Sequence, residues 1–120
     1  MSSECIFCKI SKGKISVPRI YENDNFFSVP DAYPKIEGHA LIISKKHFEN
    51  TLELPASLGQ ELLDCIKKTA IFLIEKYRAE GFNVANNNFE AGGQTVNHAH
   101  FHILPRKKGD NFSLKKILSI

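Results

Sequence analysis

Three of the chain's five histidines lie in one stretch, His98-Ala99-His100-Phe101-His102-Ile103-Leu104. Side chains alternate between the two faces of a β-strand, so this stretch predicts a strand with three imidazoles on one face and apolar side chains on the other. The imidazole is the side chain best suited to nucleophilic, acid–base or metal chemistry near neutral pH. The outer two histidines would lie roughly 13 Å apart along such a strand, so two of the three could share a metal ion but all three could not. One face is therefore predicted to carry chemistry and the other to join the core.

The composition indicates a single globular domain. The chain has 120 residues, of which 42% are hydrophobic and 24% charged, and this predicts one domain over residues 1–120. Sixteen lysines and arginines against 13 aspartates and glutamates leave a net charge of +3, and the basic residues are scattered apart from Lys45-Lys46 and Arg106-Lys107-Lys108. This distribution argues against a nucleic-acid partner and suits a small anionic ligand.

Neither a membrane nor a secretion pathway is indicated. The longest apolar run covers five residues, Ala70–Ile74, and the N-terminus lacks the pattern of a signal peptide. We therefore expect a cytoplasmic location and no membrane partner. In that setting the pair Cys5 and Cys8 is better explained by a metal site than by a disulfide framework.

Alternating apolar residues and turn residues predict five short strands, and apolar residues recurring at three- and four-residue steps predict one long helix. The expected strands cover residues 20–22, 26–29, 39–43, 82–88 and 94–104, and the expected helices cover residues 4–12 and 55–79. We expect Gly81 to end the long helix and Pro105 to stop the last strand. The predicted fold class is α+β, a five-stranded antiparallel sheet with one long and one short helix, covered on one face. Residues 110–120 have no clear period and predict no particular conformation.

The two closely spaced cysteines offer half of a metal site. Cys5 and Cys8 have the separation found in zinc knuckles, but a structural zinc ion needs four ligands. The other candidate ligands are His39, His47, His98, His100, His102 and Cys65. Two sulfurs and two imidazoles would make a closed tetrahedral site, and the pattern alone does not decide between zinc and two buried or reducible thiols.

A second group of residues leads directly into the histidine stretch. In Gly92-Gly93-Gln94-Thr95, the glycines allow close backbone approach, while amide groups and a hydroxyl can donate to an anionic oxygen. An ordinary hairpin turn is the alternative explanation for two adjacent glycines. No phosphate-binding P-loop motif occurs in the sequence, which excludes that class of nucleotide enzyme.

These motifs together resemble a known family. The stretch from Gln94 to Arg106, Gln-Thr-Val-Asn-His-Ala-His-Phe-His-Ile-Leu-Pro-Arg, is similar to the signature of the histidine triad family of nucleotide-binding hydrolases and transferases. The stretches Cys5-Ile6-Phe7-Cys8-Lys9-Ile10, Gly38-His39-Ala40-Leu41-Ile42-Ile43 and Lys45-Lys46-His47 match in the same order. The likeness is strongest to the small nucleoside phosphoramidases, and it implies the histidine triad fold.

The resemblance implies a catalytic set. His100 would attack the α-phosphorus of a nucleotide and form a covalent nucleotidyl-imidazole intermediate, which water then hydrolyses. His102 would contact the α-phosphate oxygens, and His39 would help to position the nucleophile. Gln94 and Thr95 would place phosphate oxygens and the leaving group, although many relatives have serine where Thr95 stands. A neutral imidazole is a competent nucleophile at pH 7, so this chemistry needs no metal.

The resemblance also implies a nucleotide-binding set. Asp31 would accept hydrogen bonds from the ribose hydroxyls, Asn87 would touch the phosphate or ribose, and Gly93 would allow close approach of the backbone. The walls of the base pocket would come from Ile6, Phe7, Phe27 and Val29. The expected base is a purine.

Family members with this pair of cysteines often bind zinc, and the ligands map here to Cys5, Cys8, His47 and His98. The resemblance therefore implies one structural zinc ion per chain, with no open position for water, and no cofactor for catalysis. It also implies a homodimer, which exposed apolar residues on the long helix would fit.

The predicted function is cleavage at the α-phosphate of purine nucleoside phosphoramidates. Hydrolysis of dinucleoside polyphosphates such as diadenosine tetraphosphate is the alternative within the same class. A metal-dependent hydrolase that uses His98 and His100, or His100 and His102, as a metal pair is an alternative from another class. A nucleotide-sensing module without catalysis is a further one.

Overall fold

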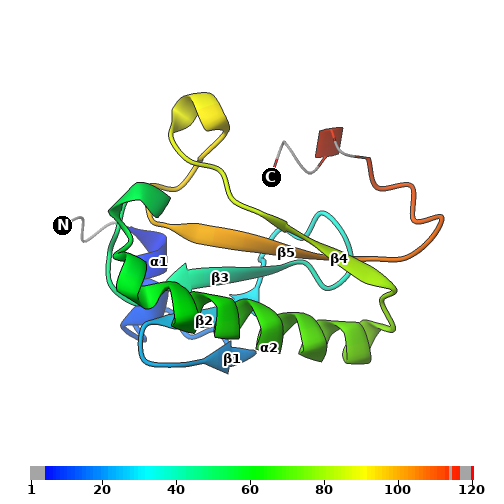
Figure 1. Ribbon diagram of the computed structural model, residues 1–120, viewed down its shortest axis with the longest axis horizontal. Coiled ribbons are helices and arrows are strands. Elements are labelled where there is room, and N and C mark those ends of the chain that lie inside the picture. The colour runs from blue at the N-terminus through cyan, green and yellow to red at the C-terminus, as the bar shows by residue number, and fades with distance from the viewer. Residues whose placement is uncertain (1–4, 114, 117–119) are drawn as a thin grey trace.

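The computed structural model describes residues 5–113, 115–116 and 120, and it contains one antiparallel sheet of five strands in the order β1-β2-β3-β5-β4 (Figure 1). The strands are β1 (Tyr21–Glu22), β2 (Phe26–Pro30), β3 (Ala40–Ser44), β4 (Gly81–Ala85) and β5 (His100–Arg106). The helices that pack on the sheet are the short α1 (Ile6–Ser11) and the long α2 (Gly59–Tyr77). The predicted α+β class, with one long and one short helix, is confirmed.

The long helix covers one face of the sheet. Phe26, Ala40, Ile42, Phe101 and Ile103 from β2, β3 and β5 form the main core with buried residues of α2. Two buried hydroxyls on this face pair with each other, since that of Thr69 on α2 donates to that of Ser28 on β2 over 2.7 Å. This face is the apolar side of the strand that the histidine alternation predicted.

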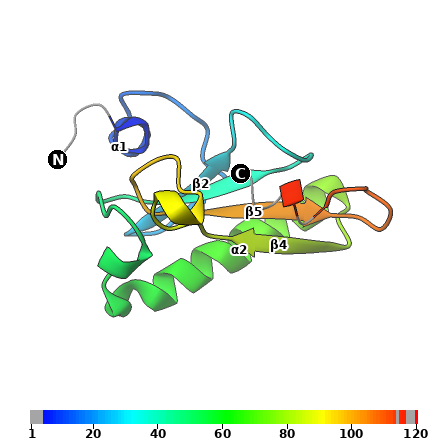
Figure 2. The same ribbon diagram turned by 90° about the horizontal axis from the view of Figure 1, so that it is seen from above.

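The other face carries the histidines, and the short helix covers part of it. Phe7 of α1 packs on Phe27, Val29, Leu41 and Ile43, which alternate along β2 and β3 with the residues that face α2. Figure 2 shows α1 and α2 on opposite sides of the sheet. The expectation of a sheet covered on only one face was therefore wrong, because α1 adds a second, smaller apolar layer beside the histidines.

Several element boundaries differ from the sequence prediction. The long helix ends at Tyr77, where Arg78 adopts the left-handed conformation (φ 55°), and Gly81 instead begins β4. Arg78 can end the helix because its backbone N–H bonds to the carbonyl of Ile74. The strand expected over residues 82–88 ends earlier, at Ala85.

The last strand is shifted along the chain relative to the prediction. It begins at His100, not at Gln94, and it continues through Pro105 to Arg106. Pro105 is tolerated because pairing of β5 with β3 ends at the pair Ala40 and Ile103, so no ladder hydrogen bond is lost where the proline lacks an N–H.

The described part of the C-terminal segment returns to the histidine face. Phe112 and Ile120 are buried against Leu104 of β5, with Ile36 and Ala85 packed around them. Residues 114 and 117–119 lie outside the described part. Among the helices that the structure describes, none combines the length and apolar character needed to cross a membrane.

One glycine fixes how closely the loop before β3 approaches the end of α2. Gly38 has φ +85°, and a Cβ added there would lie 2.8 Å from Cδ2 of Tyr77 and 3.0 Å from Cγ of Pro105. Gly109 has a similar φ of +76°, but a Cβ there would meet no atom within 4 Å. The two positions therefore separate backbone strain from steric overlap.

We expect Gly38→Ala to destabilise the protein more than Gly109→Ala. In both variants the left-handed backbone at the alanine lowers the free energy of unfolding by about 1–2 kcal/mol. In Gly38→Ala alone, overpacking against Tyr77 and Pro105 lowers it by about a further 1–3 kcal/mol. Urea unfolding of both variants and the wild type measures the difference. Equal losses of unfolding free energy would show that Tyr77 and Pro105 do not require a glycine at position 38.

Candidate active site and metal centre

The metal-ligand set implied by the resemblance is assembled in the structure. One ligand atom from each of Cys5, Cys8, His47 and His98 lies within 4.8 Å of the others. His98 Nδ1 lies 3.3 Å from Sγ of Cys5 and 3.5 Å from Sγ of Cys8, and His47 Nδ1 lies 3.2 Å from Sγ of Cys8. The cluster joins the start of α1 to the segments that follow β3 and precede β5.

The hydrogen bonds around this cluster leave the correct nitrogen of His98 free for a metal ion. His98 Nε2 lies 2.7 Å from the carbonyl oxygen of Ser44. A carbonyl oxygen only accepts, so Nε2 carries the ring hydrogen and the Nδ1 lone pair faces the two sulfurs. Tetrahedral zinc would separate a sulfur and a nitrogen ligand by roughly 3.6 Å, close to the distances found. The donor set and its geometry therefore fit zinc.

His100 is held in the form that a nucleophile requires. Its ring is buried, and Nδ1 lies 2.7 Å from the carbonyl oxygen of His98. Nδ1 therefore carries the hydrogen and Nε2 keeps a lone pair. Burial lowers the pKa of His100 below its usual value, so the ring is neutral at pH 7. Phe7 of α1 packs edge-on against this ring, with the ring centroids 5.0 Å apart.

The same reasoning assigns the hydrogens of the two neighbouring histidines. The backbone N–H of Lys35 donates to His39 Nδ1 over 3.0 Å, so His39 carries its own hydrogen on Nε2. His39 Nε2 lies 2.9 Å from His102 Nδ1, so it donates to that nitrogen and leaves the hydrogen of His102 on Nε2. Burial lowers the pKa of His39 and lowers that of His102 to about 3. Both rings are neutral, and His102 presents an N–H donor.

Asp31 is placed beside this pair of histidines. Its Oδ2 lies 3.3 Å from His39 Nε2, and its Oδ1 accepts the backbone N–H of Tyr33 over 2.9 Å. Asp31 and His39 also line a cavity of about 330 Å³ that reaches Arg19 and Lys76. The carboxylate predicted to bind ribose hydroxyls is thus next to the histidine cluster and next to open space.

Asp31, His39 and His102 also have ligand atoms within 4.8 Å of one another, which is a second possible metal group. The hydrogen bond from Lys35 argues against it. His39 Nδ1 already accepts the Lys35 N–H, so Nε2 holds the ring hydrogen and has no lone pair for a metal ion. The alternative metal pairs of the sequence prediction are not supported either. Nδ1 of His98 faces the cysteines, and His102 has no lone pair for a metal ion, because its Nδ1 accepts from His39 and its Nε2 carries the hydrogen.

The loop before the histidines is braced by Gln94. The side-chain amide of Gln94 donates to the carbonyl oxygens of Glu49 (2.7 Å) and Val96 (2.9 Å), and it accepts the backbone N–H of Phe89 (2.8 Å). Both of its donor hydrogens are therefore used within the protein. Thr95, predicted to contact the phosphate or the leaving group with Gln94, is exposed on the same loop.

Two residues in the backbone of this loop have a positive φ. Gly93 has φ +91°, which suits a glycine, but Phe89 has φ +65° and ψ 160°, a region populated almost only by glycine. The hydrogen bond from its N–H to Gln94 helps to hold Phe89 there. Strained backbone of this kind gathers at functional sites, and here it lies in the loop that leads to the triad.

The predicted wall of the base pocket is only partly accessible. Ile6 is 48% exposed, whereas Phe27 and Val29 are 0% and 2% exposed and support the layer beneath α1. Asn87, predicted to touch phosphate or ribose, donates from its amide to the carbonyl oxygen of Ile120 over 3.1 Å. Sequence reasoning did not find the N–H of Lys35 or the carbonyl of Ser44, because both are main-chain groups. The hydroxyl of Ser44 also lies 3.2 Å from Nε2 of His98.

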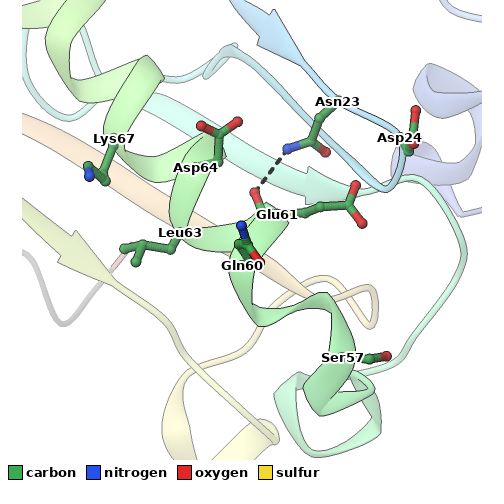
Figure 3. Close-up of a pocket in the computed structure, with 8 residues that line it drawn as sticks. All are labelled: Asn23, Asp24, Ser57, Gln60, Glu61, Leu63, Asp64 and Lys67. Atoms are coloured by element: carbon green, nitrogen blue, oxygen red, sulfur yellow. Dashed lines mark hydrogen bonds between the residues drawn. The ribbon is translucent and has the colours of Figure 1, made fainter.

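A larger depression of about 600 Å³ lies away from the histidines, beside the first turns of α2 and the turn between β1 and β2 (Figure 3). Figure 3 shows three carboxylates around it, those of Asp24, Glu61 and Asp64, and one lysine, Lys67. Carboxylates repel a phosphate group. This depression therefore does not compete with the histidine face as a site for nucleotide phosphates.

Comparison with known proteins shows the same family throughout. A profile described as the HIT domain matches residues 12–109. An uncharacterized HIT-like protein of Methanocaldococcus jannaschii is 40% identical over 111 residues, which cover 92% of this chain and 85% of that protein. The adenosine 5′-monophosphoramidase of Candida albicans is 36% identical over 109 residues, which cover 88% of this chain and 72% of that protein.

The fold of this chain is also found in a solved structure of a related protein. The zinc-bound histidine triad family protein of Mycobacterium smegmatis superposes with a TM-score of 0.85 at 32% identity, over 97% of this chain and 91% of that one. The resemblance drawn from the sequence motifs is thereby confirmed.

Proposed function

The chain belongs to the HIT family, and within it we propose a nucleotide hydrolase that cleaves at the α-phosphate of purine nucleoside phosphoramidates. The observation that carries the proposal is the hydrogen bond from His100 Nδ1 to the carbonyl oxygen of His98, which leaves a neutral ring with a free lone pair on Nε2. The Candida albicans relative named as an adenosine 5′-monophosphoramidase supports this substrate class.

The proposed reaction has two steps on one nitrogen. His100 Nε2 attacks the α-phosphorus, the bond from phosphorus to the amine nitrogen of the substrate breaks, and the leaving amine takes a proton from a water molecule. The hydroxide that remains from this water then attacks the phosphorus, the bond to His100 breaks, and the nucleoside monophosphate is released. His102 donates from Nε2 to an α-phosphate oxygen, and His39 holds the other nitrogen of His102. The ribose hydroxyls donate to Asp31.

We also propose one structural zinc ion per chain, bound by Cys5, Cys8, His47 and His98. The ligand distances and the tautomer of His98 support it, and so does a zinc-bound relative in the same family. Zinc would supply a fixed crosslink between α1 and the strand that carries His100, and the reaction itself would need no cofactor.

A homodimer is the proposed assembly. Edge strand β4 exposes Phe82 and Val84, and α2 exposes Leu63, Ile71 and Phe72. A free strand edge flanked by apolar side chains favours association, and a second copy of the chain is its simplest partner. We further propose that residues 1–120 act as one domain in the cytoplasm, without a nucleic-acid or membrane partner.

Replacing the proposed nucleophile tests the function. We expect His100→Ala to lower the turnover of adenosine 5′-phosphoramidate by roughly 10³-fold or more, because His100 supplies the nitrogen that forms the covalent intermediate. Mass spectrometry of the wild type after rapid quenching should find the nucleotidyl group on His100. Undiminished turnover in His100→Ala would refute the mechanism. Faster wild-type turnover of diadenosine tetraphosphate than of the phosphoramidate would instead favour the alternative substrate class.

The zinc proposal predicts a difference between two cysteine variants. Cys8→Ser removes a ligand, so the zinc content should fall from one ion per chain to none, and the midpoint of thermal unfolding should drop. Cys65→Ser makes the same chemical change at a buried cysteine of the α2 core, so its zinc content should stay that of the wild type. Elemental analysis of the purified proteins measures both. A wild type without zinc, or a Cys8→Ser variant that retains it, would contradict the site.

The proposed dimer predicts that a charge on edge strand β4 lowers the molecular mass of the protein in solution. Val84→Lys places a charge in the proposed interface and should yield monomers in sedimentation equilibrium, whereas the wild type sediments as a dimer. Leu52→Lys changes another exposed apolar residue, in the turn before α2, and should leave the dimer intact. The proposal fails if the wild type is monomeric or if both variants behave alike.

A further inference from the structure

The carbonyl oxygen of the proposed nucleophile has an unusual partner. Ala85, the last residue of β4, pairs with His102, so a longer β4 would place Asn87 opposite His100 and give it a main-chain hydrogen bond. The strand ends first, and the side-chain amide of Asn86 instead donates to the carbonyl oxygen of His100 over 2.9 Å. A side chain thus completes the sheet at the residue that carries the chemistry.

Asn86 is itself held by two further residues. Its Oδ1 accepts from the hydroxyl of Thr51 over 2.7 Å and from the side-chain amide of Asn88 over 2.6 Å. The Oδ1 of Asn88 accepts the backbone N–H of Thr51 over 2.8 Å. These three side chains connect the turn that follows β3 and His47 to the main chain of β5.

The direction of this relay is fixed at both ends by the main chain. The Thr51 N–H can only donate, so it selects the oxygen of Asn88, and the His100 carbonyl can only accept, so it selects the nitrogen of Asn86. Neither amide can be reversed without losing a bond to the backbone. An aspartate at position 86 has nearly the same shape, but its carboxylate would face the His100 carbonyl with an oxygen.

We propose that Asn86 is a positioning residue for His100, acting through the backbone of β5. The inference rests on the proposed role of His100 as nucleophile. Asn86 holds the His100 carbonyl, while the His98 carbonyl holds the His100 ring and the Ala99 N–H donates to the carbonyl of Phe48 over 2.7 Å. Together these bonds fix the His100 main chain and ring, so that Nε2 meets the phosphorus in one geometry. Misplacement of a reacting group by 1 Å can cost about 10²-fold in rate.

The test compares two identical chemical changes in the zinc-loaded protein. We expect Asn86→Asp to lower kcat for adenosine 5′-phosphoramidate about 10- to 100-fold while KM stays within about twofold, since Asn86 acts on attack and not on substrate binding. Asn83→Asp is the control, because among the described residues the side chain of Asn83 on β4 bonds through its Oδ1, which accepts from Arg106, and aspartate keeps that acceptor. Both kcat and KM of the control should match the wild type. Thr51→Val should lower kcat less, and Thr51→Ser, which keeps the hydroxyl, should restore it.

A second readout does not depend on turnover. The nitrogen-15 resonance of His100 Nδ1 should shift in Asn86→Asp, whereas the ring resonances of His47 should not. If the wild type turns over the substrate, an Asn86→Asp variant with unchanged kcat, or with kcat and KM altered together, overturns the inference and leaves the proposed function intact. If the wild type does not turn over the substrate, the proposed function fails, and the His100 resonance alone decides whether Asn86 positions the ring.

Discussion

The hydrogen bond from His100 Nδ1 to the carbonyl oxygen of His98 connects the two halves of the candidate site. The side chain of His98 belongs to the cysteine cluster, and its main chain orients the neighbouring imidazole. Phe7, which lies between Cys5 and Cys8 in the sequence, contacts the rings of both histidines. The centroid of its ring lies 5.8 Å from that of His98 and 5.0 Å from that of His100. A displacement of α1 would therefore reach the nucleophile by two routes, through packing and through the backbone of His98.

Main-chain groups decide which nitrogen of each histidine is free. The carbonyl of Ser44 leaves Nδ1 of His98 available for a metal ion, and the carbonyl of His98 leaves Nε2 of His100 available for phosphorus. The N–H of Lys35 places the hydrogen of His39 on Nε2, which donates to Nδ1 of His102, so that His102 becomes a donor through its own Nε2. Burial keeps all of these rings neutral. Similar side chains on one sheet face thus receive different chemical roles from the backbone around them.

The sequence predicted the parts of this arrangement that depend on periodicity and spacing. The alternation around His100 gave the correct faces of β5, and the apolar repeat gave the long helix, because both patterns reflect burial directly. The limits of β5 were wrong, since Pro105 is acceptable only where β3 has already ended, and strand length cannot be read from one strand. The N–H of Lys35 and the carbonyl of Ser44 are main-chain groups, which other residues carry as well, so the sequence did not point to them. In the sequence Asn86 is one of three consecutive asparagines, residues 86–88, and nothing there indicates that it bonds to Thr51, which lies in a distant turn.

Nitrogen-15 NMR of the histidine rings at neutral pH reports directly on which ring nitrogens carry hydrogen. If main-chain groups assign the imidazole hydrogens, the rings are neutral, with the hydrogen of His100 on Nδ1 and the hydrogens of His39 and His102 on Nε2. A His100 ring that carries its hydrogen on Nε2 would contradict this assignment, because that nitrogen would then have no lone pair with which to attack phosphorus.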